Sequence, residues 1–229
     1  SPMISQGFSA VHKIQGIGAN FIPENYWCEL IDDVICVDDE DAIKTAKQMG
    51  ATVSLDLNYR KKLWKYGKSA SQVMTELAKM ADVIIANEED IQSCLGISLR
   101  NFNTTTESYR DLCQQVKKQY PNVKIVAVTL RHSYSADKNG WSTVMLGTEK
   151  FYESTRYEIE NIVERVGAGD SFAAGLIYGL TEFNDEQKSL EFATAASCLK
   201  HSICGDFNLS TKDEVIALMN GNSTGRIQR

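Results

Sequence analysis

Short apolar runs alternate with amphipathic segments along most of the chain. The runs are four to eight residues long, which is typical of buried strands, and the segments between them carry apolar side chains at helical spacing. Strands that alternate with helices predict an α/β fold, a mostly parallel sheet with helices on both faces. The expected strands are 51–57, 83–86, 123–130, 141–146 and 151–154, and the expected helices are 41–49, 71–81, 88–95, 106–120, 171–180, 185–201 and 211–220.

The first fifty residues add one helix and one strand to this pattern. The acidic run 38–41 suits a helix start, and Gly50 suits the left-handed position after a helix end. The apolar run 34–37 predicts a strand parallel to 51–57, joined to it by the 41–49 helix in a right-handed crossover.

Composition narrows the function classes. The 229 residues are 43% hydrophobic and 24% charged, as in an ordinary globular protein. The net charge is −6 without a basic stripe, which argues against a nucleic-acid partner, and no apolar run is long enough for a membrane span. Six scattered cysteines without a Cys-x-x-Cys motif predict reduced thiols in a cytoplasmic protein, with no zinc site.

The most informative motif is Gly167-Ala168-Gly169-Asp170 before an apolar helix. Small residues let backbone N–H groups crowd together, and a helix start adds positive potential, so this loop predicts an anion hole for a phosphate. Asp170 is placed to accept a proton from a hydroxyl that attacks a phosphoryl group. Taken alone, the motif fits a glycine-rich turn with a capping Asp about equally well.

Three other expected strand ends carry polar groups. Arg60 follows the 51–57 strand, and Arg binds carboxylates or phosphates through two parallel hydrogen bonds. Asn87 opens the helix after the second strand. A role as the helix N-cap explains an Asn at this position almost as well as a role in a binding site. Thr129 ends the third strand, and Asn139-Gly140 predicts a hairpin turn beyond it.

Together, in this order, these segments resemble the PfkB family of ribokinase-like carbohydrate kinases. Gly167 to Asp170 is similar to a signature of that family, and residues 56–64, 129–141 and 205–208 resemble its 2-keto-3-deoxygluconate kinases. The resemblance covers residues 51–229. It implies ATP with Mg²⁺ and phosphorylation of a sugar acid.

The resemblance also implies a role for each matching residue. Asp170 would be the catalytic base, and Arg60 would bind the substrate's carboxylate or a phosphate. Glu164-Arg165-Val166 departs from the Asp-Thr of many members, which puts a monovalent-cation site in doubt. The remaining roles are the anion hole (Gly167, Ala168, Gly169), the nucleotide site (Asn87, Thr129, Ala195, Ala196, Gly205, Asn208) and a Mg²⁺ ligand (Glu88).

Residues 1–50 resemble an internal segment of a cysteine synthase, so the chain looks chimeric, with a junction inside the 41–49 helix. The sugar-binding half and the small lid that precede residue 51 in PfkB kinases do not match this sequence. Lys13 matches a cysteine synthase position other than the Schiff-base lysine, and Gly16 and Gly18 match a loop of that family. We expect both segments to form one continuous globular domain.

Three functional hypotheses remain open. The first is an ATP-dependent sugar-acid kinase, impaired if the sugar-binding half is absent. The second is a nucleotide-binding module without catalysis, and the third is a fragment of a pyridoxal-phosphate cysteine synthase. A monomer is expected, since the lid usually makes the dimer contact in this family.

Overall fold

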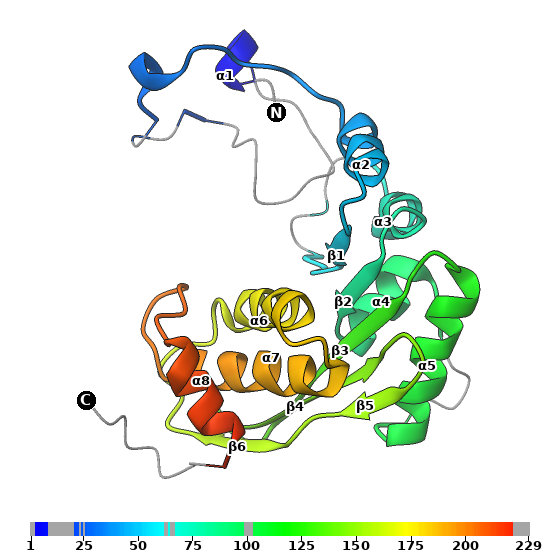
Figure 1. Cartoon of the computed structure of the whole chain (residues 1–229), viewed down its shortest axis with the longest axis vertical. Helices are drawn as coiled ribbons and strands as arrows, with labels where there is room; N and C mark the ends of the chain where they lie inside the picture. The colour runs from blue at the N-terminus through cyan, green and yellow to red at the C-terminus, as the bar shows by residue number, and fades with distance from the viewer. Residues whose placement is uncertain are drawn as a thin grey trace.

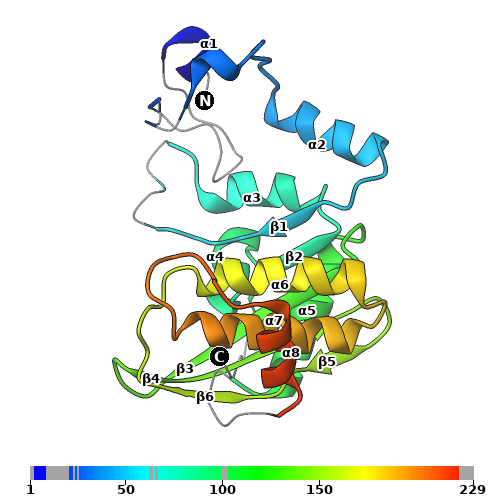
Figure 2. The same ribbon diagram turned by 60° about the vertical axis from the view of Figure 1, so that its left-hand side comes forward.

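The computed structural model describes residues 3–8, 21–22, 24, 26–61, 64, 67–98 and 103–221. It contains one six-stranded sheet with helices on both faces, as Figures 1 and 2 show. The helices and strands predicted after residue 40 are present with ends shifted by up to three residues, and the 83–86 strand and the 88–95 helix match without a shift. The helices are α1 (Met3–Gln6), α2 (Asp39–Gln48), α3 (Ala70–Ala78), α4 (Glu88–Leu95), α5 (Thr106–Gln119), α6 (Ala168–Glu182), α7 (Glu186–Lys200) and α8 (Lys212–Met219), with a 3-10 helix, η1, at Cys28–Leu30.

The sheet is mixed. Its strand order is β1-β2-β3-β4-β5, and β6 also pairs with β4. β1, β2 and β3 run parallel, whereas β4 is antiparallel to β3, and β5 and β6 are antiparallel to β4. The carboxyl ends of the three parallel strands therefore share one edge of the sheet. The strands are β1 (Ser54–Asp56), β2 (Val83–Ala86), β3 (Ile125–Ser133), β4 (Lys138–Leu146), β5 (Phe151–Glu153) and β6 (Tyr157–Glu160).

The central strand β2 is buried on both faces. Val83 and Ile85 pack in one cluster with apolar side chains of α6 and α7. Ile84 and Ala86 pack in the other, with side chains of α3, α4 and α5. Successive side chains of a strand point to opposite faces, so four consecutive apolar residues need a cover on each side. This requirement places α6 and α7 on one face and α3, α4 and α5 on the other (Figure 1).

Helix starts are fixed by the side chains that precede them. Ser69 and Thr211 make capping boxes with the third residue of α3 and α8. Asn87 caps α4 and Thr105 caps α5 by accepting a hydrogen bond from a backbone N–H of the first turn. Gly167 precedes α6 with a left-handed backbone and no side-chain cap, so the first N–H groups of α6 have no side-chain acceptor there.

Residues 34–37 do not form the predicted strand, so that prediction is wrong. They are extended without ladder bonds, and the side chain of Ile35 is 78% exposed. β1 is three residues long and leaves its outer edge unpaired among the described strands, so an added strand would gain few hydrogen bonds. Helix α2 contacts the body through Ile43 and through an ion pair of 2.5 Å between Lys47 Nζ and Asp82 Oδ2.

The hairpin turn after β3 is also not where the sequence suggested. Asn139 and Gly140 lie inside β4, opposite Ser133 and His132, and residues 134–137 form the turn. A Cβ at position 140 would lie 2.7 Å from a guanidinium nitrogen of Arg156, the far end of an exposed side chain that can shift aside. Asn139 is fully buried, unlike a turn residue.

Helices α6 and α7 pack against each other at glycine positions. A Cβ at Gly179 would lie 2.7 Å from Cα of Ser189, and one at Gly175 would lie 2.9 Å from Cα of Ala193. In both contacts the neighbouring atom is a backbone Cα, which cannot rotate away. A side chain at either position would therefore force the two helices apart.

Gly179→Ala is therefore expected to lower the free energy of unfolding by about 1–3 kcal/mol, as overpacking does, although Ala is the better helix former. Urea unfolding followed by circular dichroism measures the change. Gly169→Ala in the same helix is the control, because no atom lies within 4 Å of its added Cβ. A Gly179→Ala variant at least as stable as the wild type would contradict the close approach of α6 and α7.

Candidate active site

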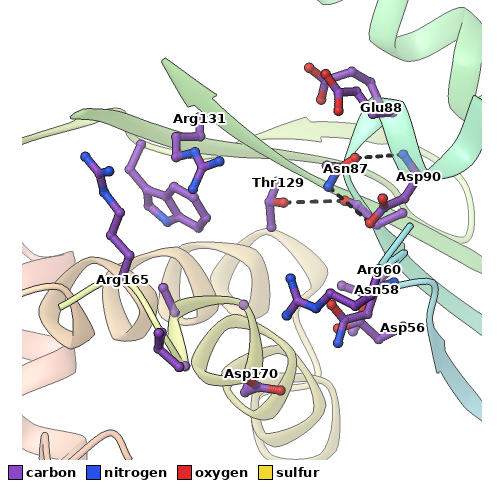
Figure 3. Close-up of a pocket in the computed structure, with 18 of the residues that line it drawn as sticks. Asp56, Asn58, Arg60, Asn87, Glu88, Asp90, Thr129, Arg131, Arg165 and Asp170 are labelled. Carbon is purple, nitrogen blue, oxygen red and sulfur yellow. Dashed lines mark hydrogen bonds between the residues drawn. The ribbon is translucent and has the colours of Figure 1, made fainter. Parts of the chain in front are cut away.

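The shared edge of β1, β2 and β3 opens onto a cavity of about 520 Å³. Residues that follow these strands line it together with the loop that begins α6, as the close-up in Figure 3 shows. The structure thus brings together eight residues that the sequence singled out: Arg60, Asn87, Glu88, Thr129, Gly167, Ala168, Gly169 and Asp170.

The α6 loop is held by its own backbone. Gly167 has φ of 81°, and a Cβ there would lie 1.9 Å from the carbonyl oxygen of Asp206, so only glycine fits. The hydroxyl of Ser197 on α7 donates to the carbonyl oxygen of Ala168 at 2.7 Å. At Gly169 no atom lies within 4 Å of an added Cβ, so that side of the loop is open. A loop of this kind can bind an anion through backbone N–H groups.

Asp170 is the third residue of α6 and is exposed to the cavity. Within the described residues its carboxylate accepts no hydrogen bond from the helix, and Gly167 occupies the N-cap position. The interpretation of Asp170 as a capping residue therefore finds no support. Its carboxylate is free to contact a ligand next to the open side of the loop.

One end of the cavity is acidic. Burial, together with the charges of Asp170 and Asp90, raises the pKa of Asp56 to about 6. Burial also raises the pKa of Glu88 and of Asp90, and the neighbouring Glu89 adds to both shifts. The positive charge of Arg60 acts in the opposite direction and offsets part of the rise in the pKa of Asp56 and Asp90. A cation at this end would relieve the remaining repulsion.

Two polar residues of the adjoining strands are fixed by neighbours. The Asn87 side chain accepts a hydrogen bond from the backbone N–H of Asp90 at 2.8 Å and donates to the Asp90 carboxylate at 3.1 Å. The Thr129 hydroxyl lies 3.5 Å from the Ala86 carbonyl oxygen, to which it donates. In Figure 3 both side chains lie between Arg131 and Asp90.

The opposite end of the cavity is basic. Arg131 of β3 and Arg165 lie there, away from Arg60, Asn58 and Asp56 in Figure 3. The guanidinium of Arg165 donates to the carbonyl oxygens of Ser135 at 3.3 Å and Ala136 at 2.6 Å, in the turn between β3 and β4. The turn therefore sets the position of Arg165.

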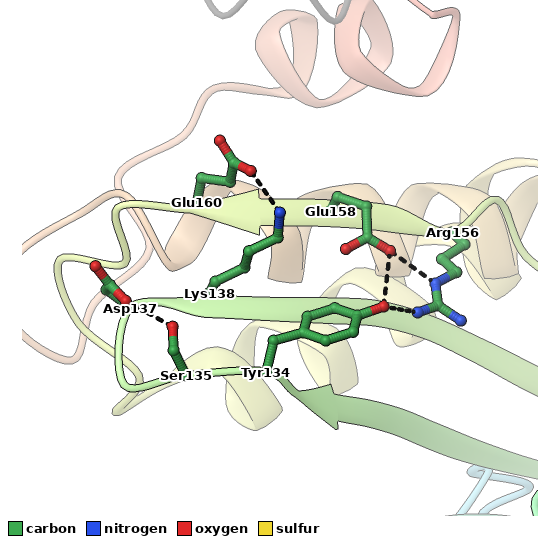
Figure 4. Close-up of polar contacts among 7 residues, drawn as sticks. All are labelled: Tyr134, Ser135, Asp137, Lys138, Arg156, Glu158 and Glu160. Atoms are coloured by element: carbon green, nitrogen blue, oxygen red, sulfur yellow. Dashed lines mark hydrogen bonds and ion pairs between the residues drawn. The ribbon is translucent and has the colours of Figure 1, made fainter.

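The turn is itself tied to β6, as Figure 4 shows. Arg156 donates to the Glu158 carboxylate at 3.0 Å and to the Tyr134 hydroxyl, and Lys138 pairs with Glu160 at 2.7 Å. These groups are exposed, and such contacts contribute little individually. Together they hold the turn at the basic end of the cavity.

A second cavity, of about 230 Å³, lies between α6, α7 and α8. Ala196 and Asn208 line it, and Asn208 donates to the Ala196 carbonyl oxygen at 3.0 Å. Ala195 is fully buried, and Gly205 is exposed in a left-handed conformation. Neither lines one of these two cavities.

Among the described residues, no group of three or more His, Cys, Asp or Glu side chains is arranged to hold a metal ion by itself. The acidic end nevertheless fits Mg²⁺, which is usually held by one or two carboxylates, with phosphates and waters completing the octahedron. Glu88, half-buried beside Asn87, supplies such a carboxylate. The five cysteines whose side chains the structure describes are free thiols, and no helix in its described part is long and apolar enough to cross a membrane.

Comparison with known proteins agrees with this geometry. Residues 25–205 match the pfkB family carbohydrate kinases. The chain belongs to this family. A crystal structure of 2-dehydro-3-deoxygluconokinase from Thermotoga maritima is 49% identical, with a TM-score of 0.74 over 80% of this chain and 54% of that chain. A 2-dehydro-3-deoxygalactonokinase from Haloferax volcanii is 26% identical over 185 residues, which are 81% of this chain and 52% of that protein.

This pfkB family member spans about half the length of those two relatives. It also shares 59% identity over 49 residues with cysteine synthase B of Campylobacter jejuni, which is 21% of this chain and 16% of that protein. The pfkB match begins at residue 25, upstream of the boundary proposed at residue 51, so the junction between the two segments stays a prediction. Lys13, Gly16 and Gly18 lie outside the described residues.

Sequence reasoning gave no role to several lining residues. Trp141, Arg165 and His201 reach the cavity from the β3–β4 hairpin, the loop before α6 and the end of α7. Trp141 and Arg165 stood inside segments used for the family resemblance, but only the folded chain shows that they line the cavity. Asp56 and Arg131 lie inside segments that the sequence analysis used for the family resemblance. Each follows an apolar run, and this position at a strand end was the sequence signal for a place in the site.

The raised pKa of Asp56 predicts a pH-dependent stability. Because this pKa, about 6, lies above the ordinary 3.8, the fold favours the protonated carboxyl. That stabilisation is present at low pH and is lost as the pH rises through about 6. In Asp56→Asn, which stays neutral, Tm relative to the wild type should therefore rise between about pH 4 and about pH 7. Asp111→Asn, at an exposed position of α5, is the control; an Asp56→Asn difference that is constant with pH would refute the assignment.

Proposed function

We propose that this protein transfers the terminal phosphoryl group of Mg-ATP to a hydroxyl of a sugar acid of the 2-keto-3-deoxygluconate type. The observation that carries the proposal is the position of Asp170 beside an open backbone anion loop, in one cavity with Arg60, Asn87 and Glu88. Membership in the pfkB family supports the reaction type. The names of the two kinase relatives support the substrate class.

In this reaction Asp170 takes the proton of the attacking hydroxyl. Its carboxylate is exposed and makes no competing hydrogen bond with the helix in the described residues, so an acceptor oxygen can approach it. The backbone of Gly167 to Gly169 holds the transferred phosphoryl group at the positive end of α6. Phosphoryl transfer depends mostly on such positioning and on charge neutralisation.

Mg²⁺ supplies the neutralising charge when bound. Glu88 is the residue proposed to hold it, directly or through water, with Asn87 and Asp90 alongside. The raised pKa of Glu88 and Asp90, caused by burial and by neighbouring carboxylates, supports a cation at this end. Asn87 cannot be a freely moving ligand, because Asp90 holds its side chain at both ends.

Arg60 is proposed to bind the carboxylate of the sugar acid. Its guanidinium is exposed to the cavity on the Asp56 side of Asp170, where an acid substrate would otherwise meet repulsion. A fork of N–H donors matches a planar carboxylate better than a lysine would. The base of the nucleotide is proposed to occupy the smaller cavity at Ala196 and Asn208.

Asp170→Asn is expected to reduce phosphoryl transfer by about 10²–10⁴-fold, because Asn cannot accept the proton. ATP affinity should stay within a few-fold, since the backbone loop is unchanged. Coupled detection of ADP with 2-keto-3-deoxygluconate, together with calorimetric titration of Mg-ATP, separates the two quantities. Asp111→Asn, at an exposed position of α5 that lines neither cavity, is the matched control.

Two results would contradict this assignment. Unchanged transfer in Asp170→Asn would remove the base from the mechanism. Binding of Mg-ATP by the wild type without any transfer to sugar acids would favour the nucleotide-binding module over the kinase.

A further inference from the structure

One lysine at the end of α7 is buried, although the proposed mechanism gives it no role. Lys200 is the last residue of α7, and its side chain is 0% exposed. It is the only Lys or Arg among the buried residues that the structure describes. Taking an ammonium group out of water is costly unless neighbouring groups compensate its charge, whereas Met or Leu would fill the same space without that cost. The charge itself therefore needs an explanation.

The charge of Lys200 is compensated by groups of two segments, one after α7 and one before α6. Lys200 Nζ donates to the carbonyl oxygen of Ile203 at 3.1 Å, at the end of α7 where the helix dipole favours a cation. Hydrogen bonds from the N–H groups of Val166 and Arg165 lower the pKa of Glu164, and the charge of Lys200 lowers it further. The ammonium thus acts on a carbonyl oxygen of one segment and on a carboxylate of the other.

These two segments are bonded to each other and lead into the anion loop. The carbonyl oxygen of His201 accepts the N–H of Val163 at 2.9 Å and that of Glu164 at 3.2 Å. The Glu164 carboxylate in turn accepts the N–H of Arg165 at 2.8 Å and that of Val166 at 3.0 Å. The residue that follows is the N-cap of α6. The entry to the anion loop is therefore bonded to the turn that Lys200 holds.

The same part of the chain supports the loop at two further points. Ser197, one turn before Lys200, donates its hydroxyl to the carbonyl oxygen of Ala168 at 2.7 Å. Asp206 places its carbonyl oxygen so close to Gly167 that a Cβ there would lie 1.9 Å away. The end of α7 and the turn after it thus form the support against which the anion loop rests.

We propose that Lys200 is a positioning residue of the anion loop, whose buried ammonium holds the turn after α7 against residues 163–166. This rests on the proposed kinase function. Without the cation, the Ile203 carbonyl oxygen loses its hydrogen bond and the Glu164 carboxylate loses a compensating charge, so the two segments separate more easily. The N–H groups of the loop then move away from the transferred phosphoryl group, and a displacement of about 1 Å can cost about 10²-fold in rate.

A lysine in the last turn of a helix can also do no more than stabilise that helix. The experiment therefore measures, besides Tm, the hydrogen exchange of residues 163–166 by mass spectrometry, the affinities for Mg-ATP and Mg-ADP, and kcat with 2-keto-3-deoxygluconate. The variants are Lys200→Ala, which leaves room for a small amine, and Lys200→Met, which keeps the aliphatic stem without the charge. Lys188→Met, exposed on the same helix, is the control.

Both Lys200 variants should exchange faster at residues 163–166, whose N–H groups all have acceptors in the wild type. We expect kcat to fall by about 10- to 100-fold. The ratio of ATP to ADP affinity should fall by about tenfold, because ADP lacks the phosphoryl group that the loop binds. Lys188→Met should match the wild type in every measurement.

Chemical rescue tests the charge directly. Methylammonium chloride should restore part of the kcat of Lys200→Ala, because this small cation fits the space that the side chain leaves. Tetramethylammonium chloride at the same ionic strength is too large for that space and should restore nothing. If Lys200→Ala fails to fold, Lys200→Met still tests the proposal through hydrogen exchange and kcat.

The other outcomes separate this proposal from the kinase function. A lower Tm with unchanged exchange at residues 163–166 and unchanged kcat would refute the positioning role and leave the kinase proposal standing. Equal rescue by both ammonium salts would trace the effect to ionic strength and refute the role of the charge. If the wild type binds Mg-ATP without transfer, the kinase proposal falls, and the exchange and the affinity ratio alone decide the role of Lys200. A wild type that binds neither nucleotide overturns both proposals.

Discussion

The burial of β2 on both faces is the constraint on which the arrangement of the site depends. Four consecutive apolar residues, each no more than 5% exposed, require a helical layer on either side of the sheet. α6 and α7 cover one face and α3 to α5 the other. The first residues of α6 lie at the edge where the parallel strands end, and there they line one cavity with the polar strand ends.

How much could be predicted from the sequence depended on whether a signal was local. Helix caps, glycines after helix ends and apolar runs are local; α4 and β2 lay where they predicted, and α6 began three residues before the predicted start. Residues 34–37 were apolar enough for a strand. The strand beside which they would have to pair, β1, is only three residues long and offers few backbone hydrogen bonds. Asn139-Gly140 carried a turn signal, but the β3–β4 pairing extends as far as Ser133 opposite Asn139 and leaves both residues in a strand.

The residues of the candidate site also divide into those with a local sequence signal and those without one. Asp170 and the small residues before it form a contiguous motif, which is why resemblance to a family was enough to find them. Trp141, Arg165 and His201 come from the hairpin, the loop before α6 and the end of α7, and only the folded chain brings them to one cavity. The result is a cavity with carboxylates at one end and N–H donors at the other, which suits an elongated ligand with both a metal and several phosphates.

The contact between Gly167 and the Asp206 carbonyl oxygen joins two loops that serve different parts of such a ligand. One begins α6 beside the larger cavity, and the other runs on to Asn208 at the smaller one. There is no room for even a methyl group between them, so neither loop can move toward the other. Substitution at position 167 is therefore closed to every residue with a side chain.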